Sequence, residues 1–314
     1  MPRSFVFLFS LLFVFLRLKY AVLNTDKIAF IINTDSGNAF KRASKNRLLA
    51  FIKAHSDYPV YTPKSAEESA EIVKQLVQQN YAAVFACGGD GTLNAISKQL
   101  LYSETALGII PLGSGNGFAR NFRIPLKWAK AMDLTKNHRE IRVDTGKVNG
   151  THFINVAGIG YSAFVSKAFD QVQGRGVWGY FKVVLQNLKR DNRKAQFRFP
   201  GHERNFTGWT FEVFNGTQWG GGISVAPHSK CDDGLLQMVS FKKISDVELP
   251  YMAMRVALNL HLGDRYVQRE NFSEGILQFE GILSYQVDGD YVGELNSEAR
   301  FEVLPKSLKV WIPA

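Results

Sequence analysis

Three glycines, an aspartate and a threonine stand together at residues 88–92, in the order Gly-Gly-Asp-Gly-Thr. An apolar run precedes them and an apolar-periodic segment follows, so the pattern predicts a strand, a tight turn and a helix. At such a turn the backbone N–H groups can face an anion, and glycines let a phosphate approach closely. Asp90 would repel a phosphate unless a metal ion stood between them, and Thr92 adds a hydroxyl. We interpret this turn as a nucleotide-phosphate and Mg²⁺ site.

The turn differs from the two best-known phosphate motifs. No Gly-Lys-Ser/Thr follows it, which excludes a Walker-type loop, and its glycine spacing is not that of a dinucleotide fingerprint. A plain strand-to-helix turn without ligand is the alternative interpretation.

The elements around this turn predict a parallel α/β sheet. Buried strands are expected at residues 28–32, 82–86 and 107–110, and a polar or glycine-rich loop follows each of them. Ligands of parallel sheets bind at the carboxyl ends of the strands, so the three loops should converge on one edge. The residues expected to bind the nucleotide there are Asn33, Ser36, Gly37, Gly88, Gly89, Gly91, Thr92, Asn94, Gly113, Ser114, Gly115 and Asn116.

The pattern changes near residue 141, where short strand-like runs begin to dominate. They are interrupted by helical segments, which predicts a mainly antiparallel β-sandwich as a second domain. We expect domains at residues 24–140 and 141–304. Two acidic turns stand out in this half, Asp232-Asp233-Gly234 and Asp288-Gly289-Asp290. Asp-Gly pairs are common in ordinary turns, so each turn has a structural alternative.

Composition limits the class of partner. The 314 residues carry a formal net charge of +10 and a pI near 9.5, which favours anionic partners. The chain has no arginine-rich run and no interleaved basic and aromatic motif, so we expect a nucleotide and an acidic membrane surface rather than nucleic acid. Two cysteines give no disulfide framework, which fits the cytoplasm.

The amino-terminal residues 1–23 contain an apolar run at residues 5–16, flanked by basic residues. That run is short for a membrane-spanning helix, which needs about 20 apolar residues. Three interpretations stay open: a membrane anchor, an upstream extension from a misplaced start codon, and an export signal. The expected location is therefore the cytoplasm, with the protein peripheral to or anchored at the inner face of the membrane.

The ordered set of motifs resembles the diacylglycerol kinase catalytic family, which includes bacterial diacylglycerol kinases and sphingosine kinases. The motifs that carry this resemblance are Asn33-x-x-Ser36-Gly37, Gly88–Asn94, Gly113–Asn116, Asn155–Gly160, Gly221–Pro227, Asp232–Leu236 and Asp288–Asp290. Four positions depart from the family pattern. Thr34 stands where the family usually has proline, and Gly117 stands where bacterial members often have aspartate. Asp290 replaces a glutamate, and Gln237 stands where an acidic residue is common.

The resemblance implies a nucleotide-binding α/β domain of Rossmann-like, NAD kinase-like type, completed by a last strand at residues 305–314. It implies ATP as phosphate donor and Mg²⁺ as cofactor. By similarity, Asp288 would accept the proton of the lipid hydroxyl, and Asp90 would help to hold Mg²⁺. Asp232 with Asp233 would hold a structural metal, and Asp290 is a further possible metal ligand.

The resemblance therefore implies an ATP-dependent lipid kinase, with diacylglycerol ahead of sphingosine or ceramide as acceptor. A soluble kinase of the NAD kinase type is the runner-up, because such kinases share the Gly-Gly-Asp-Gly-Thr motif. A catalytically silent binding protein is a third alternative. A lipid substrate at an anionic membrane surface is the expected partner, and a homodimer is possible.

Overall fold

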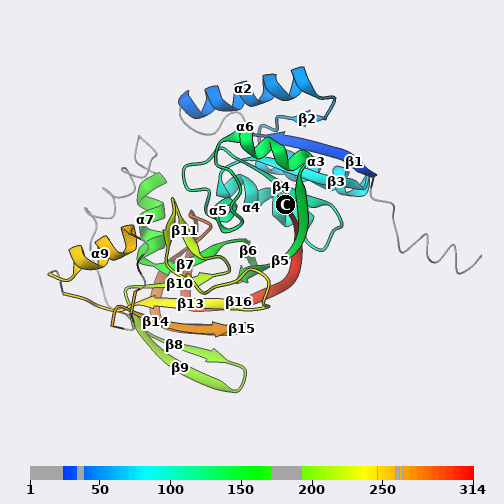
Figure 1. Ribbon diagram of the computed structural model, residues 1–314. Coiled ribbons are helices and arrows are strands. Elements are labelled where there is room, and N and C mark those ends of the chain that lie inside the picture. Colours follow the sequence, from blue (N-terminus) through cyan, green and yellow to red (C-terminus); the bar gives the residue numbers. More distant parts are fainter. Residues whose placement is uncertain are drawn as a thin grey trace, which may run out of the picture.

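The computed structural model describes residues 24–33, 39–170, 193–245, 247–258, 260, 262–263 and 265–314. Figure 1 shows an α/β domain with its helices and parallel strands, and below it a second domain built mainly of strands. The fold class predicted from the sequence, a parallel α/β domain followed by an antiparallel β-sandwich, is confirmed.

The first domain alternates strands and helices. Its elements are β1 (Asn24–Ile32), α2 (Ala39–His55), β2 (Val60–Tyr61), α3 (Ala66–Gln78), β3 (Tyr81–Gly88), α4 (Asp90–Leu100) and β4 (Ala106–Pro111). The strands pair in parallel in the order β2-β1-β3-β4. All residues of β3 and β4 are buried, as expected for strands in a parallel sheet that is covered on both faces. At the start of α3, the Ser65 hydroxyl accepts a hydrogen bond from Glu68 N at 3.1 Å, which caps the helix.

Short helices connect the two domains. They are α5 (Gly117–Asn121), α6 (Trp128–Ala131) and a 3₁₀ turn at Met132–Thr135, and β5 (His138–Val148) follows them. β5 begins before residue 141 and is part of the same continuous sheet as β4, so the backbone pairing does not break at the predicted domain boundary.

The second domain packs two antiparallel layers. Its elements up to the last strand are β6 (Thr151–Phe153), β7 (Val156–Gly160), α7 (Tyr161–Asp170), β8 (Arg193–Phe199), β9 (His202–Gly208), β10 (Thr210–Phe214), β11 (Gln218–Gly220), β12 (Ile223–Ser224), β13 (Leu236–Phe241), α9 (Leu249–Ala257), β14 (Val267–Phe272) and β15 (Glu274–Val287). Phe197, Phe206, Phe211, Phe272 and Phe301 meet in the core between the layers. These aromatic contacts bury large apolar areas.

The last strand, β16 (Asp290–Pro313), belongs to both domains. Its first half pairs with β15, and its second half pairs with β5. Val310 also pairs in parallel with Leu107 of β4, so β16 continues the first domain's sheet. Residues 308–312 do return to the first domain, as the resemblance implied.

Some sequence predictions lie outside the described residues. They are the apolar run at residues 5–16 and the loop residues Ser36 and Gly37. Among the helices that the structure describes, none has both the length and the apolar composition needed to cross a membrane.

Candidate functional site

The glycine turn at residues 88–92 joins β3 directly to α4. Gly89 is in extended conformation immediately before Asp90, the first residue of the helix, and Leu93 N donates to Gly89 O at 3.1 Å. The first N–H groups of a helix have no acceptor within it, so α4 directs N–H groups and the positive end of its dipole to this turn. The Thr92 side chain lies over Gly88, where an added Cβ would overlap it. This is the arrangement that binds anions.

The second glycine loop lies against the first. Leu112 N donates to Gly88 O at 2.9 Å, and a Cβ on Gly113 would lie 2.5 Å from Gly89 Cα. Asn116, in left-handed conformation with φ 48°, holds the second loop by exchanging two hydrogen bonds with the Gly113 backbone, at 2.9 and 3.0 Å. Ser114 is exposed beside it. The structure brings these two predicted loops together at backbone contact.

The third predicted loop begins at the same edge. Ile32 pairs with Cys87, and Cys87 pairs with Ile110, so the residues after all three strands lie in register. Asn33 follows Ile32 and is half-buried there. Ser36 and Gly37 lie outside the described residues.

The Asp90 carboxylate faces the start of α5. Its two oxygens accept hydrogen bonds from Gly117 N at 3.1 Å and Phe118 N at 3.2 Å. Burial raises the pKa of Asp90, and the backbone N–H groups of Gly117 and Phe118 act in the opposite direction. Asp90 therefore ties the first glycine turn to the helix that follows the second loop, a role that the sequence did not suggest.

The Asp288 carboxylate is buried in a closed set of N–H donors. Its Oδ1 accepts from Asn155 N at 2.8 Å and Val156 N at 3.0 Å, and its Oδ2 accepts from Ile154 N at 2.9 Å and Asn94 Nδ2 at 2.5 Å. A carboxylate has about four lone-pair positions, so these donors fill them. Burial raises the pKa of Asp288 to about 6, although the four donors favour the charged form.

Asn94 connects the two domains at this point. Its side chain is buried on α4 and donates both to Asp288 and to the His152 carbonyl, the latter at 3.1 Å. The sequence predicted Asn94 as a nucleotide-binding residue. In the structure its amide group holds the second-domain carboxylate against the first domain, and nucleotide binding by Asn94 stays a prediction.

Asp290 lies against the glycine turn from the other side. A Cβ on Gly91 would lie 2.5 Å from Asp290 Oδ2, so a larger residue at position 91 would displace the end of this side chain. Asp290 is exposed, whereas Asp288 two residues earlier is 9% exposed. The Asp288-Gly289-Asp290 turn therefore places one carboxylate inside the domain junction and one at its surface.

The other acidic turn is fixed by a buried aspartate that the sequence did not single out. Asp144 is fully buried, and its oxygens accept from Gly234 N and Lys306 N, both at 2.7 Å. Asp232 and Asp233 are exposed on this turn. In the described ranges no three His, Cys, Asp or Glu side chains are grouped so that they could hold one metal ion. The metal assignments for Asp232 and Asp233 stay predictions.

A third glycine segment, which the sequence predicted only as a family signature, closes the junction. Gly221 N donates to Gly115 O at 3.0 Å, and a Cβ on Gly117 would lie 3.3 Å from Gly220 Cα. Beside it, Asn121 Nδ2 donates to Asn155 Oδ1 at 2.9 Å and Thr217 N donates to Asn121 Oδ1 at 3.1 Å. The available signal was the run of three glycines at residues 220–222. It marks a place where the backbone of the second domain contacts Gly115 and Gly117.

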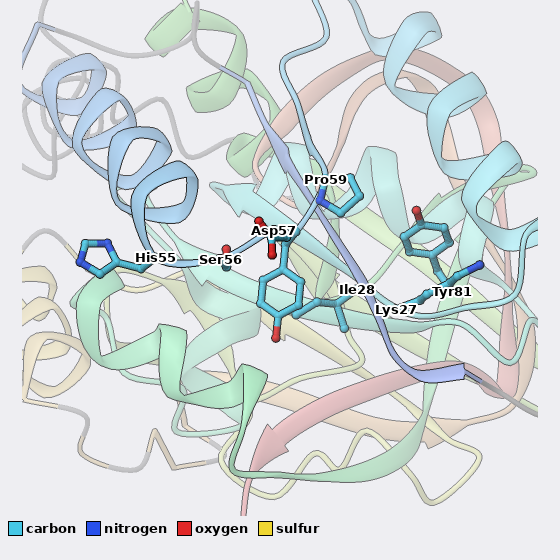
Figure 2. A pocket seen from close by; sticks show the side chains of 8 residues that line it. Lys27, Ile28, His55, Ser56, Asp57, Pro59 and Tyr81 are labelled. Carbon is cyan, nitrogen blue, oxygen red and sulfur yellow. The ribbon is translucent and has the colours of Figure 1, made fainter.

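A separate cavity of about 530 Å³ lies at the opposite end of the strands (Figure 2). Lys27, Ile28, His55, Ser56, Asp57, Tyr58, Pro59 and Tyr81 line it. Tyr81 is the first residue of β3, so this cavity is at the amino ends of the parallel strands. None of the predicted nucleotide-binding residues lines it.

Two families match the chain. Residues 27–148 match the diacylglycerol kinase catalytic domain, and residues 155–312 match the YegS C-terminal NAD kinase beta sandwich-like domain. Together they cover both domains of the fold described above.

Individual proteins agree with this assignment. The chain is 35% identical over 179 residues to "Probable lipid kinase YegS-like" of Chromohalobacter salexigens, which covers 55% of this chain and 58% of that protein. It is 26% identical over 290 residues to "Diacylglycerol kinase" of Staphylococcus carnosus, covering 90% of this chain and 94% of that protein. The fold is also similar to a solved structure described as "Crystal structure of a putative diacylglycerol kinase from Bacillus anthracis str. Sterne". The two superpose with a TM-score of 0.75 at 22% sequence identity, over 92% of this chain and 97% of that chain.

Proposed function

Because the chain belongs to the family of diacylglycerol kinase-like lipid kinases, we propose that it transfers the γ-phosphate of ATP to the hydroxyl group of a membrane lipid. Diacylglycerol is the acceptor that we propose, with phosphatidate as the product. The runner-up acceptors are sphingosine and ceramide, since two relatives carry the broader description of YegS-like lipid kinase.

One observation carries this proposal. The acidic turn of the second domain contacts the start of α4 at two points. Asn94 donates a hydrogen bond to Asp288, and the Asp290 carboxylate lies next to Gly91. Carboxylates thus stand beside a helix terminus suited to phosphates, at a junction between two domains. Phosphoryl transfer needs this combination of positioning and charge control more than it needs covalent chemistry.

The donor side is formed by the first domain. The N–H groups at Gly88, Gly89 and Gly91 would surround the phosphates, and the Thr92 hydroxyl would hydrogen-bond to them. The loop of Gly113–Asn116 would form the opposite wall, since it contacts the first turn directly. Asn33, at the end of β1, would contribute a side-chain amide at the same edge.

The chain's carboxylates fit the Mg²⁺ that the family implies. Mg²⁺ is usually bound through one or two carboxylates together with phosphate oxygens and water, so a cluster of three acidic side chains is not required. Asp90 and Asp290 flank Gly91 and would supply those carboxylates. When bound, Mg²⁺ would offset the charge that develops on the transferred phosphoryl group.

Asp288 is the residue that we propose to accept the proton of the lipid hydroxyl. Its pKa of about 6 leaves it ionised at neutral pH, as a general base must be. Its lone-pair positions are all occupied, so one donor has to give way to the hydroxyl. Asn94 is the donor best suited to this, because it is a side chain, whereas the other three donors are backbone groups.

The decisive test is acceptor specificity. Purified protein with Mg²⁺ and γ-labelled ATP is offered, in separate reactions, diacylglycerol, monoacylglycerol, sphingosine, ceramide, NAD and fructose 6-phosphate. We expect label in phosphatidate, with much less in the sphingoid products. If sphingosine or ceramide were phosphorylated in preference to diacylglycerol, the chain would still be a lipid kinase but its proposed acceptor would be wrong. Transfer to NAD or the sugar alone would overturn the lipid kinase proposal.

A further inference from the structure

The outer face of α9 carries apolar side chains that nothing in the described structure covers. Tyr251, Met254 and Leu258 are 48%, 47% and 62% exposed, and Val247 just before the helix is 88% exposed. Their spacing of three and four residues places them on one face of the helix. We call Val247, Tyr251, Met254 and Leu258 the α9 stripe.

The inner face of α9 is packed in the ordinary way. Met252 is buried among Val239, Phe241 and Val267, and Val256 packs against the same cluster. The helix thus has an apolar face on both sides, one of them in the core and the other in solvent. A helix that needs only to cover a sheet would carry polar residues on its outer face.

We propose that the α9 stripe docks on the surface of a lipid bilayer with anionic headgroups. This inference rests on the proposed function, because a kinase whose acceptor is a membrane lipid has to work at a bilayer. An amphipathic helix lies in the interface with its apolar side chains inserted, and tyrosine suits that depth because it has an apolar ring and a polar tip.

The charges near the stripe fit an anionic surface. Arg255 lies beside Tyr251, with its guanidinium 5.7 Å from the ring centroid and Nη1 donating to the hydroxyl at 3.1 Å. Lys243 is exposed at the end of β13. Glu248, the acidic residue at the start of α9, is paired with Arg265. The chain as a whole carries +10, which adds long-range attraction to anionic lipids.

The position of α9 connects this surface to the candidate site. α9 packs on β12, and the β11–β12 hairpin carries Gly220 and Gly221, which contact Gly115 of the second glycine loop and Gly117 at the start of α5. Figure 1 shows α9 at the periphery of the second domain, on the same side of the molecule as α7. One hairpin therefore links the docking surface to the nucleotide loops.

A fluorophore on the stripe tests contact with the bilayer directly. Met254→Cys in the full chain is labelled with an environment-sensitive dye and mixed with vesicles of phosphatidylcholine and phosphatidylglycerol in equal parts. Ala54→Cys, exposed on α2, is the matched control. The native thiols label slowly, because Cys87 is buried and burial raises the pKa of Cys231 to about 12.

We expect dye emission at position 254 to shift to the blue and to rise about threefold with vesicles, as for a side chain inserted in the interface, while position 54 does not respond. Protein that sediments with vesicles without a change at position 254 would overturn the inference and would assign membrane binding elsewhere. A change at position 254 that follows protein concentration without vesicles would assign the stripe to self-association instead.

Kinetics distinguish this inference from the proposed function. The triple variant Tyr251→Ser, Met254→Ser, Leu258→Ser should lose about tenfold in activity on diacylglycerol in vesicles. It should keep its activity on a short-chain diacylglycerol dissolved as monomers, and Ile282→Ser, an equally exposed site on β15, should change neither. Equal activity of the triple variant on vesicles would overturn the docking role. Inactivity of the unsubstituted chain on both forms would instead refute the proposed acceptor.

Discussion

Replacing Asp288 with asparagine separates its structural role from its chemical one. The carboxylate accepts four N–H hydrogen bonds, two at each oxygen. Asparagine keeps one oxygen and turns an NH₂ group toward two of these donors. Each buried donor left without a partner costs about 1–3 kcal/mol, so this loss destabilises the fold by about 2–6 kcal/mol.

A second effect opposes this loss. The pKa of Asp288 is raised from 3.8 to about 6, so holding the ionised carboxylate in the fold at neutral pH costs about 3 kcal/mol relative to water. Asparagine is neutral and removes that cost. The two effects partly cancel, and we expect Asp288→Asn to change the free energy of unfolding by an amount between a gain of about 1 kcal/mol and a loss of about 3 kcal/mol.

Activity should respond very differently. Loss of a general base lowers the rate by about 10²–10⁴-fold, while the phosphate-binding turn stays intact. The assays are urea unfolding for stability, calorimetry for ATP affinity, and phosphate transfer to diacylglycerol for activity. Glu280→Gln is the control, since it removes an exposed carboxylate of β15 that takes part in neither proton transfer nor Mg²⁺ binding in this scheme.

The pH dependence gives an independent readout. A general base acts when ionised, so kcat/KM should fall as the pH drops through about 6, and Glu280→Gln should keep that limb. Because the folded state binds the proton of Asp288 more tightly than the unfolded state, the contribution of the protonated Asp288 to stability is lost as the pH rises from about 4 to 6.

If Asp288→Asn retained more than about a tenth of the activity, Asp288 would not be the proton acceptor.

Two further substitutions test other contacts. Gly91→Ala should raise the Mg²⁺ concentration needed for activity by about tenfold, because the new methyl group displaces the Asp290 side chain. Its melting temperature should change little, since that side chain can move. In the control Gly113→Ala, the methyl group meets the Gly89 backbone, which should lower the free energy of unfolding by about 1–3 kcal/mol. Burial raises the pKa of Glu212 to about 7, so the protonated form stabilises the fold by up to about 3 kcal/mol. This contribution is lost as the pH rises from about 4.5 to 7. Glu212→Gln should therefore make the free energy of unfolding less dependent on pH in that range. A variant with an unchanged stability profile between those pH values would mean that Glu212 is not the titrating group.

Local signals account for most of the first domain that the sequence predicted correctly. The apolar runs before each loop are long and continuous, and buried parallel strands require this. The glycine turn at residues 88–92 acts over a few residues, so the sequence shows it directly. The convergence of two glycine loops follows from the carboxyl-edge rule for parallel sheets.

Long-range pairing accounts for what the sequence did not show. Short strand-like runs were expected after residue 141, whereas β15 and β16 are long and continuous. Their exposed stretches carry Glu, Asn and Ser, which have low strand propensity, and the cross-strand partners decide the outcome. The roles of Asn94 and Asp144 were missed for the same reason, because their hydrogen-bond partners lie 58 to 194 residues away.

The strand shared by the two domains also determines when the chain can fold during its synthesis. β4 needs β16 as its neighbour, yet the part of β16 that pairs with it is made about 200 residues after β4. Until then the edge of β4 offers unpaired N–H and C=O groups to other chains. The amino-terminal domain therefore reaches its final sheet only after the strands of the second domain have been made, and folding is slow relative to a protein with local contacts. A nonsense mutation near the carboxyl terminus would thus damage the domain encoded first.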